Sequence, residues 1–87
     1  MAKILKVELV GSVEKYLHDF KNFGEDVYRD LRDECSVSID EIDSAGTAFH
    51  LRDLKATFVR TAAARVLKIA RKCRMDEVIA VTELPEP

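Results

Sequence analysis

Basic side chains are concentrated in one stretch of the sequence. Between Lys55 and Arg74 there are seven Lys or Arg residues, and no Asp or Glu lies between Asp53 and Asp76. The preceding residues 1–54 carry seven basic and twelve acidic side chains. Because ammonium and guanidinium groups gathered on one surface attract phosphates and carboxylates, the stretch indicates a site for an acidic macromolecule.

A helix over this stretch would separate its cations into two groups. Four cations lie opposite the apolar stripe on a helical wheel, and Arg65 and Lys72 lie at its margin. We expect the two marginal cations to lie nearer to carboxylates and the other four to be free. The four are Arg60, Lys68, Arg71 and Arg74. The sequence predicts these four as partner-binding residues, with RNA or a protein as the acidic partner. The alternative is a solvated face neutralised by an acidic first helix, with basic residues favoured near a helix C-terminus by the helix dipole.

A second set of residues holds the groups used in nucleophilic catalysis. Glu8, Ser38 and His50 fall on the solvent-facing side of predicted strands and supply a carboxylate, a hydroxyl and an imidazole. Any solvated sheet face carries such residues, and strands alone form no concave pocket that excludes water. Neither His50 nor His18 has a second metal-ligating neighbour at suitable spacing. We therefore expect no enzyme, no metal and no cofactor.

The two cysteines, Cys35 and Cys73, fall on predicted core faces. A small secreted domain held together by disulfides usually carries four or more cysteines, and zinc sites need a second Cys or His nearby. A reactive thiol or redox pair is the alternative to two small buried side chains in a reducing compartment. We favour two small buried side chains in a reducing compartment, and this interpretation places the protein in the cytoplasm.

The elements that position these residues follow from apolar periodicity. Period-two alternation predicts strands, and apolar residues three and four apart predict helices. The strands are expected at about 3–10, 35–40, 47–52 and 78–81, and the helices at about 13–33 and 54–74.

Three local signals refine the boundaries of these elements. Asp43-Ser44-Ala45-Gly46 is typical of a turn between the two middle strands. Asp53 is expected to be the N-cap of the second helix. Gly24, on the apolar stripe of the first helix that also includes Leu17, marks either a close approach to the sheet or a break. We expect one unbroken helix.

The order β-α-β-β-α-β predicts an α+β fold. We expect a two-layer split β-α-β (ferredoxin-like) sandwich, with a four-stranded antiparallel sheet and both helices on one face. The expected strand order is 4-1-3-2, and another order is the alternative. Phe20, Phe49 and Val66 should be buried together between the layers. Residues 1–84 are expected to form a single domain and 85–87 a short tail, since proline stops strand pairing.

The element order and length resemble those of the RNA-recognition-motif family. That family stacks bases on aromatic side chains of its first and third strands. The first strand here, Ile4-Leu5-Lys6-Val7-Glu8-Leu9, has no aromatic residue, and Phe49 of the third strand is assigned to the buried face. The resemblance extends to topology and implies no function.

Composition limits the remaining function classes. The chain has 87 residues, of which 47% are hydrophobic and 34% charged, with a net charge of −2. No apolar run approaches the roughly 18 residues of a membrane span, so no membrane partner is expected. We expect a small non-enzymatic cytoplasmic binding or regulatory module that contacts RNA or an acidic protein through its second helix. The alternative is a structural or assembly domain that forms a homodimer through the open sheet face or the fourth strand.

Overall fold

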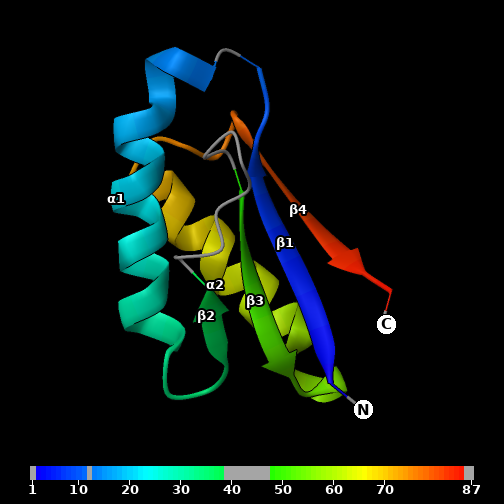
Figure 1. The fold of residues 1–87 in the computed structure, drawn as a ribbon. Coiled ribbons are helices and arrows are strands. Elements are labelled where there is room, and N and C mark those ends of the chain that lie inside the picture. Colours follow the sequence, from blue (N-terminus) through cyan, green and yellow to red (C-terminus); the bar gives the residue numbers. More distant parts are fainter. Residues whose placement is uncertain (1, 12, 39–47, 86–87) are drawn as a thin grey trace.

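Four strands and two α-helices make up the part of the chain that this computed structural model describes, residues 2–11, 13–38 and 48–85 (Figure 1). In chain order the elements are β1 (Lys3–Leu9), α1 (Val13–Leu31), β2 (Ser36–Ser38), β3 (Ala48–Leu54), the 3-10 helix η1 (Ala56–Phe58), α2 (Val59–Lys72) and β4 (Ile79–Leu84). The predicted turn at 43–46, together with Ile39 and Asp40, lies outside the described residues.

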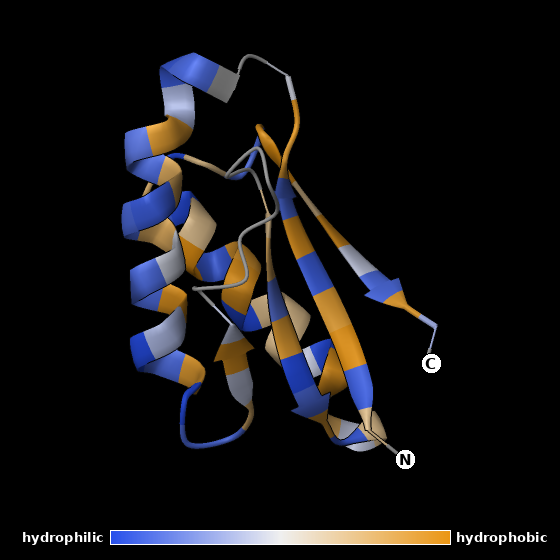
Figure 2. Ribbon diagram, viewed as in Figure 1, coloured by the Kyte–Doolittle hydropathy of each residue, from blue (hydrophilic) through white to orange (hydrophobic). Residues whose placement is uncertain are grey.

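The four strands form one antiparallel sheet in the order β2-β3-β1-β4. This order, counted from the opposite edge, is the expected 4-1-3-2. On the central strand, Val7 lies opposite Phe49 of β3 and Val81 of β4. Hydrophobic and hydrophilic residues alternate along β1 (Figure 2), so one side of the sheet is apolar. The predicted α+β class is confirmed.

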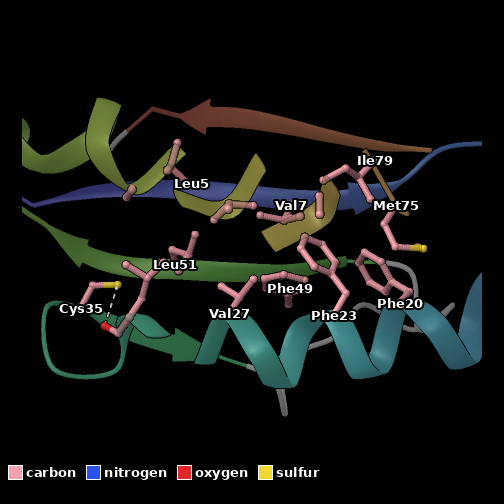
Figure 3. Close-up of a cluster of buried hydrophobic side chains, with 14 of the residues drawn as sticks. Leu5, Val7, Phe20, Phe23, Val27, Cys35, Phe49, Leu51, Met75 and Ile79 are labelled. Atoms are coloured by element: carbon pink, nitrogen blue, oxygen red, sulfur yellow. Dashed lines mark hydrogen bonds between the residues drawn. The ribbon is translucent and has the colours of Figure 1, made fainter. Parts of the chain in front are cut away.

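Both helices pack on that apolar side. Side chains from α1, α2 and the three longest strands belong to one buried cluster, and among the described residues no polar or charged residue is buried. Phe20, Phe49 and Val66 are each at most 1% exposed, as predicted. The ring of Phe49 lies 5.4 Å from that of Phe20 and 5.7 Å from that of Phe23, measured between centroids (Figure 3).

The first helix is continuous through Gly24, as expected. Gly24 is buried, and a Cβ atom built there would lie 3.5 Å from two atoms of the Phe49 ring, which is ordinary van der Waals contact. The helix ends at Leu31, two residues before the predicted end. Leu17, assigned to the apolar stripe, is 38% exposed, because it lies at the margin of that stripe and α1 buries only its centre.

The third strand contains a β-bulge that the sequence analysis did not predict. Leu5 lies opposite Leu51, but Lys3 lies opposite Leu54, so β3 uses one residue more than β1 over this interval. Asp53 within it has φ of 60°, in the left-handed region. The extra residue returns Leu54 to the helix side of the sheet, where it is fully buried.

The bulge corrects two predictions about the second helix. Asp53 is not its N-cap but part of β3, and its Oδ2 accepts a hydrogen bond of 2.8 Å from Ser36 Oγ of β2. The helix does not begin at residue 54. Leu54 ends the strand, Lys55 is extended, and α2 follows the single turn of η1.

The fourth strand is longer than predicted. It runs from Ile79 to Leu84 rather than over 78–81, and it pairs with β1 throughout. The added residues include Glu83, which places a negative charge in this strand. Glu83 faces Leu5 at the end of the sheet and is exposed there.

Candidate functional site

The buried face of α2 fixes the direction in which its cations point. Ala62, Val66 and Ala70 are buried against the sheet and α1. Because 3.6 residues make one turn, the opposite face of α2 carries Arg60, Lys68 and Arg71, three of the four cations predicted as partner-binding residues. The fourth, Arg74, lies beyond α2, which ends at Lys72 rather than at the predicted residue 74. Arg60, Lys68, Arg71 and Arg74 are all exposed. We call these four residues the basic stripe.

No residue of the basic stripe forms an ion pair within ranges 2–11, 13–38 and 48–85. Arg71 and Lys72 lie in the last turn of α2, where the helix dipole favours positive charge. Asp76 and Glu77 follow the stripe in the sequence and are exposed, but neither pairs with Arg74. The stripe is therefore a set of exposed cations that can meet an external anion without breaking an ion pair of the described structure.

The position of Arg74 is set by the backbone at the end of α2. Its N–H donates to the carbonyl of Arg71 (3.2 Å), and the N–H of Met75 donates to the carbonyl of Ala70 (2.7 Å). These two bonds form a Schellman motif, in which the residue at position 74 takes the left-handed conformation, here with φ of 58°. Glycine is the usual residue there. Met75, which follows, is fully buried and anchors the motif.

Arg65 is anchored to α1, unlike the basic stripe. Its Nε donates to Asp30 Oδ2 (3.0 Å), its Nη2 donates to the Asp30 carbonyl oxygen (2.8 Å), and its Nη1 donates to Glu34 Oε1 (3.3 Å). Its guanidinium also lies over the Phe58 ring, 5.9 Å from the centroid. The hydrogen bond to Asp30, followed by that to Glu34 and by the charges of both carboxylates, raises the pKa of Arg65. The expectation that Arg65 lies near carboxylates is confirmed.

Lys72 lines a groove between α1 and α2. The groove has a volume of about 430 Å³ and is lined by Asp26, Arg29, Asp30, Ile69 and Lys72. Asp26 forms an ion pair with Arg29 on the same helix. Lys72 shares the groove with two carboxylates, as predicted, but forms no ion pair in the part of the chain described here. Cations and carboxylates alternate within the groove, so it presents no field of one sign.

The catalytic group types noted in the sequence lie on one sheet face. Ser38 of β2 is directly opposite His50 of β3, and Glu8 of β1 is opposite Ala48, two residues from His50. Glu8 Oε2 forms an ion pair with Lys6 Nζ at 3.5 Å. His18 is elsewhere, exposed on α1 and within 3.3 Å of the Asn22 amide nitrogen. Within the described ranges, no group of three or more His, Cys, Asp or Glu side chains is arranged to hold a metal ion.

Both cysteines are free thiols. Cys35 is buried and its Sγ donates a hydrogen bond to the Leu31 carbonyl (3.6 Å), drawn in Figure 3; burial, followed by the nearby Glu34 carboxylate, raises its pKa to about 11. Cys73 is half-buried against the core, less than predicted, because it lies at the edge of the α1–α2 contact. Burial and a hydrogen bond from its thiol to Asp26 Oδ2 (3.5 Å) raise its pKa. Raised pKa values leave both thiols protonated and weakly nucleophilic at neutral pH.

The chain has no match among protein-family models, curated proteins or solved structures. None of the helices in the described residues combines the length and apolar character that crossing a membrane requires.

Proposed function

We propose that the chain is a small non-enzymatic binding module that contacts an acidic macromolecule through the basic stripe. The observation that supports this most is the contrast within α2. Arg65 is held by two carboxylates, whereas Arg60, Lys68, Arg71 and Arg74 are exposed and unpaired within the described structure. Neutralisation by α1 therefore accounts for Arg65 but not for Lys72, the other marginal cation, and it leaves the outward-facing cations available.

The arrangement of the elements fits this role. We propose that the fold is the ferredoxin-like split β-α-β sandwich, in agreement with the central position of β1 and the strand order. In such a sandwich the second helix shows its outer face to solvent while its inner face is part of the core. The two free thiols agree with a reducing compartment, and we propose a cytoplasmic location.

Reversing two charges of the basic stripe should abolish partner binding and leave the fold intact. In the double variant Arg71→Glu, Arg74→Glu, we expect a loss of less than about 1 kcal/mol in the free energy of unfolding, since exposed charges contribute little. A pull-down from lysate compares the macromolecules retained by wild type and variant. The wild-type complex should also dissociate steeply with added salt.

Two controls separate charge from other effects of the substitutions. Lys21→Glu with Arg32→Glu changes the net charge equally, from exposed positions in and after α1, and should retain the partner. Arg74→Gly removes one cation and introduces the residue that best adopts the left-handed conformation at this position. The variant should be at least as stable to unfolding as wild type, so a loss of binding would not result from unfolding. A reversed variant that retains the same partners as wild type would refute the proposal.

A second candidate function is self-assembly through β4. This strand is at the edge of the sheet, and its six residues include the half-buried Ala80, Val81 and Leu84. An edge strand presents unpaired backbone groups to a second copy of the chain. Sedimentation over a range of micromolar concentrations should then show a monomer–dimer equilibrium. A constant monomer mass up to high micromolar concentration would exclude this candidate, and with it the open sheet face as a dimer interface.

A further inference from the structure

We propose that the basic stripe binds the phosphate backbone of double-stranded RNA without reading its bases. This inference rests on the proposed function and names the partner of the same surface. It depends on three features of α2: the residues that are present on its outer face, the residues that are absent from it, and the position of α1 beside it.

The composition of the outer face suits phosphate. Three of the four cations are arginine, whose planar guanidinium donates two parallel hydrogen bonds to a phosphate group. From Arg60 to Arg71 the helix rises about 16 Å at 1.5 Å per residue, so the stripe extends over several phosphates of one nucleic-acid strand. Between these ends the outer face carries Ala64, whose small side chain lets a backbone come close to the helix.

The same face lacks the features of other interfaces. Among the described residues, the exposed large apolar side chains are Val10, Leu17 and Tyr28, and none of them lies on α2. Protein interfaces depend on a few buried aromatic or aliphatic anchors at their centre, with charges at the rim. Single-stranded nucleic acids are bound by stacking bases on aromatic side chains. A face of cations with no such anchor fits a duplex backbone, for which cations alone provide affinity.

The position of α1 favours an RNA duplex over a DNA duplex. The helix α2 is not free on both sides, because α1 lies beside it on the same face of the sheet and Arg65 ties the two together (Figure 1). Reading the DNA major groove requires a helix that enters a groove about 12 Å wide. The minor groove of A-form RNA is wide and shallow, and proteins bind across it through phosphates and 2′-hydroxyls. The exposed cations of the basic stripe can reach it without insertion of α2.

Fluorescence anisotropy with defined probes tests the inference. The probes are two 20-base-pair RNA duplexes of unrelated sequence, a DNA duplex, a single-stranded RNA and poly-L-glutamate. We expect the two RNA duplexes to bind alike, and more tightly than the other probes. With four cations the slope of log K against log salt should be about −3 to −4, so affinity falls about 100-fold between 50 and 200 mM salt.

Charge-reversal variants show whether the stripe is responsible. In Arg71→Glu, Arg74→Glu the salt slope should fall to about half, with an affinity change of about 10-fold over the same salt range. Lys21→Glu, Arg32→Glu should retain most of the wild-type slope. A wild-type slope in the stripe variant would overturn the inference by placing the RNA elsewhere on the molecule.

The remaining outcomes separate this inference from the proposed function. If poly-L-glutamate binds through the stripe and the RNA duplexes do not, the partner is an acidic protein: the inference is overturned and the proposed function stands. Equal binding of DNA and RNA duplexes, or tighter binding of single-stranded RNA, also overturns it. If no probe binds and the pull-down shows no difference between wild type and the stripe variant, both proposals fail.

Discussion

Phe49→Ala should destabilise the protein by about 3–5 kcal/mol, the range found when a large buried aromatic residue is truncated. The Phe49 ring is 1% exposed and packs against both Phe20 and Phe23, so its loss leaves a cavity lined by two rings and the backbone of Gly24 (Figure 3). A single core of this size contributes only a few kcal/mol of net stability. We therefore expect the variant to be largely unfolded at 25 °C, as measured by urea titration with circular dichroism.

Gly24→Ala is the matched control for this region. It adds one methyl group at ordinary contact distance from the same ring, and it replaces glycine in a helix interior, which is worth up to about 1 kcal/mol. This variant should unfold at an equal or higher urea concentration than wild type. If Phe49→Ala instead kept the wild-type midpoint, the ring would not be in the core and β3 would be paired out of register by one residue.

Leu54→Ala should be the second most damaging change, with a loss of about 2–5 kcal/mol. Leu51 faces the core, so regular alternation along β3 would turn Leu54 to the opposite face of the sheet. The bulge at Asp53 turns it to the core side, where it is fully buried opposite Lys3 of β1. Urea titration of this variant therefore tests the bulge itself.

Asp53→Gly is the control for the backbone of the bulge. Glycine adopts the left-handed conformation without strain, so only the exposed hydrogen bond from Ser36 is lost, and the change should stay within about 1 kcal/mol. Asp53→Val should be worse, because a β-branched residue is strained at positive φ. Equal effects of Leu54→Ala and Asp53→Gly would mean that Leu54 is not a core residue.

The existence and order of the elements could be predicted because their periodicities differ. The alternation around Val7 has period two, and the apolar residues around Phe20 and Val66 recur every three or four positions. The period-two pattern forms a continuous apolar face only in a strand, and the pattern of three and four forms one only in a helix. The α+β class and the joint burial of Phe20, Phe49 and Val66 followed from this.

The junction between β3 and α2 could not be predicted, because the same side chain serves two conformations. An Asp before an apolar helical pattern is typical of an N-cap, and Asp is also among the residues that tolerate a left-handed backbone. Only the pairing with β1, which is remote in sequence, shows which conformation Asp53 adopts. The extension of β4 past Val81 was missed for a similar reason. Its main chain continues to pair with β1 although Glu83 breaks the apolar alternation.

The orientation of the candidate site could be predicted better than its backbone. Ala62, Val66 and Ala70 define the buried side of α2, and so the wheel correctly placed three outward cations and the marginal Arg65. Arg74 lies past the end of α2, where the wheel does not apply. The left-handed conformation of Arg74 had no signal in its own residue type, because arginine has no preference for positive φ. The apolar Met75 that follows is the remaining clue to a Schellman motif.

Two opposing selective pressures act on position 74, just after the end of α2. Folding alone favours glycine at position 74, because the left-handed conformation there costs free energy for most residues that have a side chain, arginine among them. Binding of an acidic partner through the basic stripe favours arginine or lysine at this position. Orthologous sequences can therefore reveal which pressure prevails. If the stripe is used, position 74 should stay basic wherever Arg60, Lys68 and Arg71 are retained, and glycine should appear only in lineages where the other cations have drifted.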